Sequence, residues 1–129
     1  MLITTIPQYV QGLKNVKLVA ITDATADGAI LYTAPSAADF NASVITSILV
    51  SEYSGNADTI TVTVTDSTAT FSLFKVKAVA ANTTIELLTK DLILQSGDVI
   101  RASAATASRL HVVASIQELA LHRTPQSAL

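Results

Sequence analysis

The sequence predicts an all-β fold, a single antiparallel β-sandwich of about eight strands with jelly-roll or immunoglobulin-like topology. The first reason is strict alternation of apolar and polar residues, clearest in DTITVTVTD at 58–66, because alternation places the two kinds of residue on opposite faces of a strand. The second reason is that such runs recur about every ten residues, with turn residues between them. The third is the length of 129 residues, which suits one domain with one core.

The chain is expected to divide into an N-terminal arm at 1–14, a sandwich domain at 15–119 and a short C-terminal tail at 120–129. The first segment holds Pro7 and Gly12 among mixed apolar and polar residues, a pattern that fits neither a long helix nor a long strand. The last segment is polar and contains a proline, so we expect it to lie outside the core.

Short segments rich in Asp, Asn, Ser and Gly separate the predicted strands, since these residues form turns by bonding to their own backbone or by adopting left-handed conformations. They are DATADG (23–28), SGNAD (54–58), DSTAT (66–70) and SGD (96–98). The density of β-branched residues between them favours strand over helix. The strands are predicted at 16–22, 29–35, 43–53, 58–66, 70–79, within 81–98, at 99–105 and at 109–119.

The composition is apolar and poor in charge, with 50% hydrophobic residues, 14% charged residues and a formal net charge of -2. Because an average soluble domain has about 25% charged residues, the surface must consist largely of Thr, Ser, Ala and Asn. No basic cluster exceeds the pair Lys14 and Lys17, so we expect no nucleic-acid partner. No window has the pattern of a signal peptide or a membrane span, so we expect neither export by that route nor a membrane partner.

The residue types that carry enzyme chemistry form no recognisable constellation. There is no cysteine, which removes thiolate nucleophiles and sulfur-ligated metals, and the two histidines, His111 and His122, make a poor set of metal ligands. Most acidic residues lie beside predicted turns, where carboxylates bond to backbone donors. Asp23 and Asp27 in DATADG faintly resemble a calcium loop, but the ligand spacing of such loops is absent. We therefore expect no catalytic residue, no metal site, no cofactor and no enzymatic activity.

The threonine face of the 58–66 strand, formed by Thr61, Thr63 and Thr65, is a candidate contact surface. Natural sheets usually guard their exposed edges with lysine or proline, and this chain has few such residues. Threonine faces pack closely and can bond to a neighbouring backbone. We therefore predict that these three residues lie against copies of the same protein or against a larger shell.

The N-terminal arm supplies a second candidate contact. We expect Ile3, Ile6 and Tyr9 to anchor the arm on a neighbouring copy in a trimer or ring, because tyrosine combines a large apolar body with a polar tip and is favoured at interfaces. The alternative is that Ile3 and Ile6 cover the open end of their own sandwich.

The order of segments in residues 43–119 carries a resemblance to a known group of proteins. An Ile-Leu-Val strand at 48–50 leads to a Ser-Gly-Asn turn, and the alternating Thr-Val strand, ANTTIELL, LQSGD and VVASIQEL follow in that order. This order resembles a domain of the virion structural proteins of tailed bacteriophages, particularly phages of marine and cyanobacterial hosts.

The resemblance implies a non-enzymatic β-sandwich that is located in the virion and assembled in the host cytoplasm. The role expected first is a capsid decoration (cement) protein that forms a homo-oligomer and binds the major capsid protein. A head-tail connector, tail or baseplate component, bound to tail or neck proteins, is the alternative within the same class. A carbohydrate-binding module is the alternative from another class, although it needs an aromatic-lined groove and aromatic residues make up only 5% of the chain.

Overall fold

The structure, a computed structural model, describes residues 8–18, 28–36, 38 and 40–121. These residues form nine β-strands and no helix, which confirms the predicted all-β class. In chain order the strands are β1 (Gln8–Leu18), β2 (Ala29–Thr33), β3 (Phe40–Glu52), β4 (Asp58–Thr65), β5 (Thr70–Val79), β6 (Thr84–Glu86), β7 (Leu92–Leu94), β8 (Val99–Ala104) and β9 (Leu110–Leu121).

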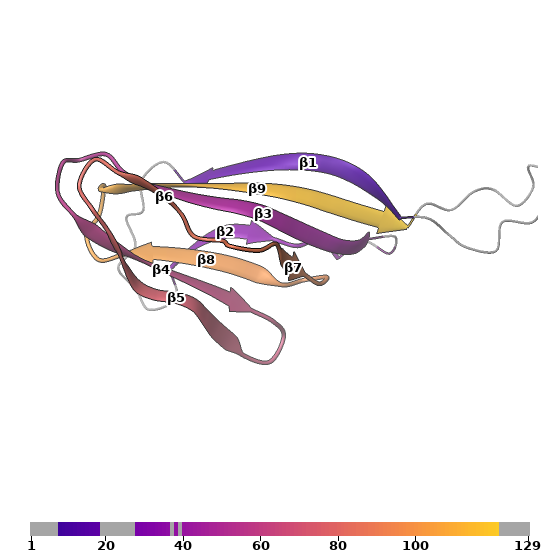
Figure 1. The fold of residues 1–129 in the computed structure, drawn as a ribbon. Coiled ribbons are helices and arrows are strands. Elements are labelled where there is room, and N and C mark those ends of the chain that lie inside the picture. Colours follow the sequence, from indigo (N-terminus) through magenta and orange to yellow (C-terminus); the bar gives the residue numbers. More distant parts are fainter. Residues whose placement is uncertain (1–7, 19–27, 37, 39, 122–129) are drawn as a thin grey trace, which may run out of the picture.

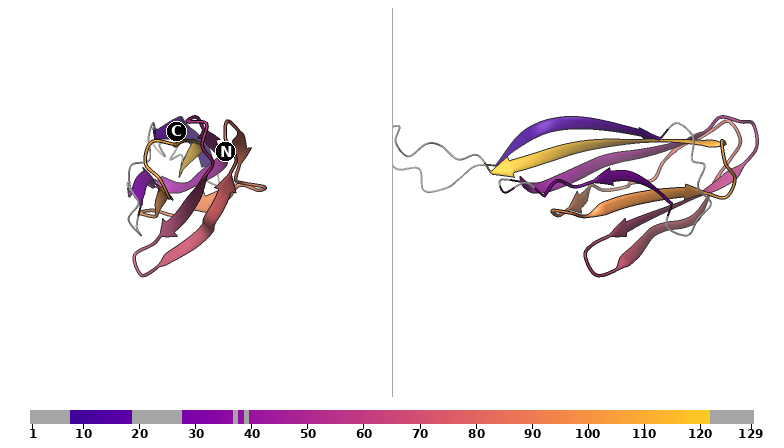
Figure 2. Two further views of the ribbon diagram at one scale, coloured as in Figure 1. Left: turned by 90° about the vertical axis from the view of Figure 1, so that its left-hand side faces the viewer. Right: turned by 180° about the vertical axis from the view of Figure 1, so that it is seen from behind.

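The strands form two antiparallel sheets that lie over one another as the two layers of a sandwich (Figure 1, Figure 2). The first sheet has the order β1-β9-β3-β6, and β7 also pairs with β3. The second sheet has the order β2-β8-β4-β5. Because Gln8 is paired with Leu121, β1 begins and β9 ends side by side at one end of the sandwich.

The core lies between the sheets and is filled by the inward-facing residues of both layers. In β4, Ile60 and Val62 are fully buried, as the alternation of DTITVTVTD predicts. Opposite them in the first sheet, Ile45 and Ile48 of β3 are also fully buried. Burial of one such aliphatic side chain stabilises the fold by roughly 1.5–3 kcal/mol, so these rows of residues hold the layers together.

A bulge keeps the core face of β3 in register. The pairing of β3 with β9 shifts between Ile45 and Ser47, which leaves Thr46 as an extra residue. One extra residue moves the following side chains to the opposite face, and so Ile45 and Ile48, three positions apart, both point into the core.

The sandwich begins earlier than the sequence predicted. Residues 8–14, expected in the arm, belong to β1, which pairs with β9. Gly12 lies opposite Glu118 beside a register shift, so the irregularity that obscured the strand pattern is a bulge within a strand. At the other end, β9 extends into the segment predicted as the tail. The remaining parts of the predicted arm and tail, 1–7 and 122–129, lie outside the described residues.

Two further segments differ from the predicted boundaries. The run predicted within 81–98 forms two separate short strands, with β6 paired to β3 at Leu49–Ser51 and β7 paired to β3 at Ser43–Ile45. The strand predicted at 16–22 is described only to Leu18, and the DATADG turn lies outside the described residues apart from Gly28.

Candidate functional site

The predicted threonine face lies on the outer side of the second sheet. Thr61, Thr63 and Thr65 are paired with Ser103, Arg101 and Val99 of β8, in that order. Thr63 is 7% exposed, and its hydroxyl has no hydrogen-bond partner among the residues that the structure describes. The middle of this face is therefore already covered within the chain itself.

The two outer threonines are used within the second sheet. Oγ1 of Thr61 accepts a hydrogen bond of 3.0 Å from the backbone N–H of Val76. The hydroxyl of Thr65 lies 3.0 Å from that of Thr70 across the β4–β5 pair. Both threonines remain partly exposed, so contact of this face with another chain stays a prediction.

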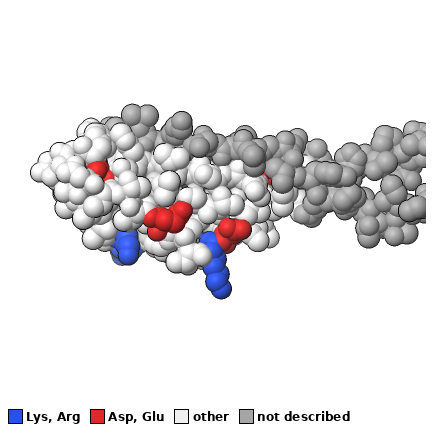
Figure 3. Space-filling view, turned by 45° about the horizontal axis from the view of Figure 1, so that its top comes forward, with Lys and Arg blue, Asp and Glu red and all other residues white. Residues whose placement is uncertain are grey.

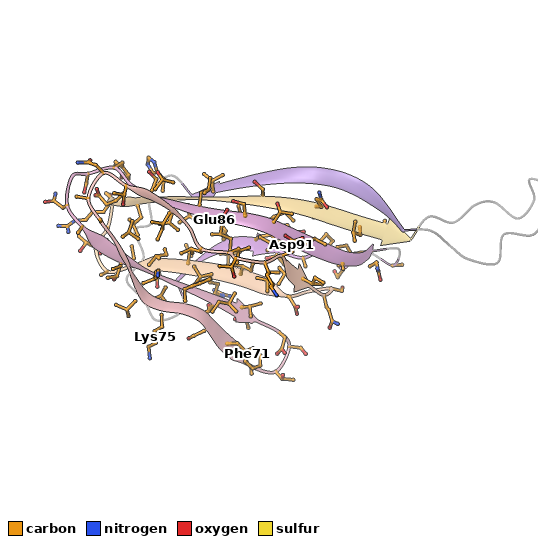
Figure 4. The ribbon with its side chains drawn as sticks, in the orientation of Figure 1. Phe71, Lys75, Glu86 and Asp91 are labelled. Carbon is orange, nitrogen blue, oxygen red and sulfur yellow. The ribbon has the colours of Figure 1, made fainter. Side chains whose placement is uncertain are left out.

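β5 is a free edge of the second sheet and carries features that protect such an edge. Lys75 and Lys77 are exposed, and Val76 between them has a positive φ of 53°. Figure 4 shows Lys75 pointing away from the sandwich. Two register shifts also interrupt the pairing with β4. A bulged edge with charged side chains resists pairing with a further strand. The edge strand β5 is therefore better protected against such pairing than the sequence suggested.

The outer side of the first sheet has a different character. We call it the β3–β9 face, and it comprises Ala42, Val44, Ser47, Leu49 and Ser51 of β3, Thr84 and Glu86 of β6, Ile93 of β7, and His111, Val113, Ser115, Gln117 and Leu119 of β9. Among these residues Glu86 alone is charged; it lies opposite Leu49 and accepts a hydrogen bond from the Ser47 hydroxyl. Leu49 is 39% exposed and Ile93 is 64% exposed. In Figure 3, which turns the top of the molecule forward, most of the described surface is uncharged, with acidic groups near its middle.

An aromatic pair lies at one end of the β3–β9 face. The rings of Tyr53 and His111 stack with centroids 3.9 Å apart and an angle of 19° between their planes. Tyr53 is 43% exposed. Its backbone N–H donates to the carbonyl of Arg109, which extends the β3–β9 pairing beyond the strand end. His111, for which the sequence predicted no metal, therefore serves as a packing partner for an exposed ring.

Glu52, the last residue of β3, holds two turns together. Its side chain is 2% exposed, and its carboxylate accepts hydrogen bonds from the backbone N–H groups of Ser54 (2.8 Å), Gly55 (3.0 Å) and Asn82 (2.8 Å), and from the Ser54 hydroxyl. Burial alone raises the pKa of Glu52, but these hydrogen bonds outweigh it and lower the pKa to about 2. The carboxylate thus stays ionised and fixes the β3–β4 and β5–β6 turns.

Glu86, at the end of β6, performs a related task at the bulge of β3. Its carboxylate accepts hydrogen bonds from the Ser47 hydroxyl and from the backbone N–H groups of Ile48 (2.8 Å) and Leu88 (3.3 Å). Burial raises the pKa of Glu86, and the hydrogen bonds lower it by more. Figure 4 shows Glu86 and Asp91 on the β6–β7 segment, which runs alongside β3 in the first sheet. The Glu86 carboxylate therefore accepts the hydrogen bond of the Ile48 N–H, which in a regular sheet the backbone carbonyl of a neighbouring strand would accept.

A buried polar group lies near the end of the sandwich where β1 begins. The Tyr32 hydroxyl of β2 donates to the Glu118 carboxylate of β9 and lies 2.7 Å from the Ser43 hydroxyl of β3. All three residues are buried. Desolvation by burial raises the pKa of Tyr32 well above its usual range, and the bond to Glu118 raises it further. These contacts tie the two layers together by polar interactions.

The described residues hold no group of His, Cys, Asp or Glu side chains that could bind a metal ion. Within the same part of the chain, no helix is long and apolar enough to cross a membrane. The faint calcium loop at Asp23 and Asp27 lies outside the described residues, and so do Ile3, Ile6 and His122. Tyr9, predicted as an arm anchor, is instead part of β1 and lies opposite Ala120.

Sequence reasoning placed most carboxylates in turns but missed which of them matter most. Glu52 and Glu86 lie within runs predicted as extended, at 43–53 and 81–98, and in the structure they end β3 and β6. Glu118 continues an alternating run. The alternation itself held the clue for Glu118, because it occupies an inward position of β9 between the buried residues Ile116 and Ala120.

No protein-family model, curated protein or solved structure matches this chain.

Proposed function

We propose that this protein is a non-enzymatic structural protein of a tailed-phage virion, acting as a capsid decoration (cement) protein that stabilises the shell through contacts between subunits. The proposal rests on the order of segments in residues 43–119, which the structure describes as β3 to β9. The proposal includes the location of the protein in the virion and its binding to the major capsid protein.

The observation that carries the proposal is the nesting of the strand pairs. Starting from the β4–β5 hairpin, β3 pairs with β6 and β7, β2 pairs with β8, and β1 pairs with β9. The chain is thus one long hairpin rolled into two sheets, and this arrangement supports the jelly-roll over the immunoglobulin-like topology. Jelly rolls are frequent in viral capsid domains.

The use of the carboxylates also favours a structural role. A catalytic acid or base needs a pKa near the working pH and access to a substrate. Here the hydrogen bonds of Glu52 and Glu86 lower their pKa values, and their oxygens are occupied by donors of the same chain. These groups stabilise turns and a bulge, which is the requirement of a rigid building block.

Two alternative roles can be distinguished from a decoration protein by experiment. A head-tail connector, tail or baseplate component must be a rigid building block, as a decoration protein must, and it differs from a decoration protein in the number of copies per virion. A carbohydrate-binding module is favoured by one observation, the exposed Tyr53 stacked on His111, because sugars bind to aromatic rings. Specific retention on a glycan array that is lost in Tyr53→Ala would support this second candidate and count against the structural role.

The deciding experiment is to count this chain in purified virions by quantitative mass spectrometry, with the major capsid protein as the internal standard. Hundreds of copies would support a decoration protein that follows the capsid lattice. About a dozen to a few dozen copies would indicate a ring or tail component. Absence of the chain from virions overturns the proposal.

A further inference from the structure

We propose that Arg101 and Thr63, on the outer side of the second sheet, form a binding site for a carboxylate group, the side chain of an Asp or Glu residue of a partner protein. The inference deepens the proposed structural role by naming the surface that meets the partner and the chemical group that the partner brings. It rests on the proposed function only in expecting that the partner is a protein.

The site lies in a row of residues that crosses the whole second sheet. Arg101 of β8 is paired with Ile30 of β2 on one side and with Thr63 of β4 on the other, and Thr63 is paired with Ser72 of β5. Paired residues of neighbouring antiparallel strands have their side chains about 5 Å apart on the same face. A cation and two hydroxyl groups therefore lie next to one another, beside the side chain of Ile30, which is 51% exposed.

The guanidinium of Arg101 has no partner within the chain. Arg101 is partly buried, and its side chain takes part in no hydrogen bond or ion pair with the residues that the structure describes. Arg109 is also partly buried, but its Nη1 donates to the carbonyl of Ala57 at 3.1 Å. The side-chain donors of Arg101 are thus available to a group from another molecule.

The hydroxyl of Thr63 is a second donor without an acceptor. Thr63 is 7% exposed, and its Oγ1 atom has no hydrogen-bond partner among the described residues. A carboxylate has four lone-pair sites, so one that is bound by Arg101 can also accept the O–H of Thr63. Because the Thr63 oxygen is covered, this second bond requires a local shift of the side chains around it.

The charge around the site is positive. Asp58, the only acidic residue of the four strands of the second sheet, lies at the far end of β4 and accepts the backbone N–H of Thr106. The exposed Lys75 and Lys77 lie on the edge strand β5. This side of the sandwich is therefore cationic in a chain whose formal net charge is -2, and a cationic surface attracts an anionic group.

A carboxylate of a protein is the anion that the site favours. Arginine binds a carboxylate through two parallel hydrogen bonds, and it is enriched in protein interfaces. Nucleic acids and anionic membranes are bound by larger groups of cations than the one arginine and two edge lysines described on this side. A protein that covers Arg101 must also bring an acceptor, because an unpaired guanidinium is costly to bury.

The test is NMR spectroscopy of the full chain during addition of an oligoglutamate peptide with capped ends, at low ionic strength. We expect the side-chain N–H signals of Arg101 and the backbone N–H signal of Thr63 to shift. The side-chain signals of Arg109 should stay in place, because its guanidinium is bonded within the chain. An oligoglutamine peptide of equal length should cause no shift, and inorganic phosphate should bind more weakly than oligoglutamate.

Three variants test the two donors. Arg101→Gln is expected to weaken the binding of oligoglutamate by about tenfold or more, since it removes hydrogen bonds to a charged group. The matched control, Arg109→Gln, should bind like the parent. Thr63→Val should weaken binding although it removes an unsatisfied buried hydroxyl and is expected to stabilise the fold. Circular dichroism of each variant establishes that the fold is intact.

Three results would overturn the inference: no response to oligoglutamate, equal loss of binding in Arg101→Gln and Arg109→Gln, or tighter binding of phosphate than of oligoglutamate. Unchanged affinity in Thr63→Val would likewise contradict a site with two donors. The outcome is separate from that of the virion count. A chain that binds oligoglutamate as expected and is absent from virions supports the site and contradicts the proposed function. A chain that is abundant in virions and does not bind oligoglutamate contradicts the site and leaves the proposed function intact.

Discussion

The backbone N–H of Asn82 donates a hydrogen bond of 2.8 Å to Oε2 of Glu52, so that one carboxylate joins two turns whose residues are 30 positions apart in the sequence. The same carboxylate receives the N–H groups that open the β3–β4 turn. Buried backbone donors without acceptors are costly, and a single ionised side chain satisfies several of them here. The conformation of this end of the sandwich therefore depends on the charge of Glu52.

We predict that Glu52→Gln lowers stability at neutral pH and weakens its dependence on acid. In the folded chain the pKa of Glu52 is about 2, against 4.5 in its ordinary state. Between these values the unfolded chain binds more protons, so the free energy of unfolding rises with pH; the contribution is complete above the ordinary pKa and is lost as pH falls toward 2. Urea unfolding between pH 2 and pH 7 measures this change.

The control for the loss of one negative charge is Asp91→Asn, at an exposed position on the link between β6 and β7. It is expected to unfold like the parent at every pH. Some acid dependence should remain in Glu52→Gln, because hydrogen bonds also lower the pKa values of Glu86 and Asp66. An unfolding midpoint whose pH dependence is the same in Glu52→Gln and in the parent would contradict the assignment.

We predict that two threonine-to-valine changes in β4 act in opposite directions. Thr63→Val replaces a buried hydroxyl, which has no partner among the described residues, with a methyl group of similar size, and should stabilise the fold by about 1 kcal/mol. Thr61→Val removes the acceptor of the Val76 N–H and should destabilise it by about 0.5–1 kcal/mol. Thermal unfolding of both variants gives the comparison, and a change of the same sign in both would refute this account of the threonine face.

The strand β4 shows how much the sequence can predict. Alternation placed Ile60 and Val62 in the core correctly, because the side-chain period of a strand is a local property. The unequal burial of Thr61 and Thr63 could not be predicted, since both lie on β4 between β8 and β5 and their burial depends on side chains that are distant in the sequence. Strand order is decided by contacts between segments far apart in sequence, which a periodicity does not encode.

The strand β1 shows what the sequence pattern could not predict. Pro7 and Gly12 interrupt the pattern of the first segment and led to the prediction of an arm at 1–14, of which residues 8–14 belong to β1. In the structure the irregularity is a shift in the pairing with β9 between Val10 and Gly12, and Gly12 lies opposite Glu118. The hydrogen bonds of the Glu52 and Glu86 carboxylates could not be predicted either, because only the fold brings their partners within reach. Local pattern thus predicted the elements, and the polar contacts between them required the structure.

We predict that Tyr32→Phe destabilises the fold by about 1–3 kcal/mol, because it removes the hydroxyl that donates to the buried Glu118 and contacts Ser43. The matched control is Tyr53→Phe, which removes a hydroxyl from a side chain that is 43% exposed and should change stability by less than about 0.5 kcal/mol. Urea unfolding at pH 7 measures both. Equal effects of the two changes would show that the Tyr32 hydroxyl contributes nothing specific.

The glycines that precede β2 and β8 allow a comparison of steric and conformational costs. Gly28 and Gly97 both have positive φ, +70° and +82°, where a side chain costs about 1–2 kcal/mol. A Cβ on Gly28 would lie 2.6 Å from the carbonyl oxygen of Ala102, whereas a Cβ on Gly97 meets nothing within 4 Å. Because the atom that Gly28→Ala would meet belongs to the backbone of β8, relief requires the two paired strands to separate.

We therefore predict that Gly97→Ala costs about 1 kcal/mol and that Gly28→Ala costs at least twice as much. Thermal unfolding of the two variants, with circular dichroism to confirm the β fold, provides the measurement. Similar costs at the two positions would mean that β2 and β8 can move apart freely, and the close packing of Gly28 on Ala102 would then not be a constraint on the second sheet.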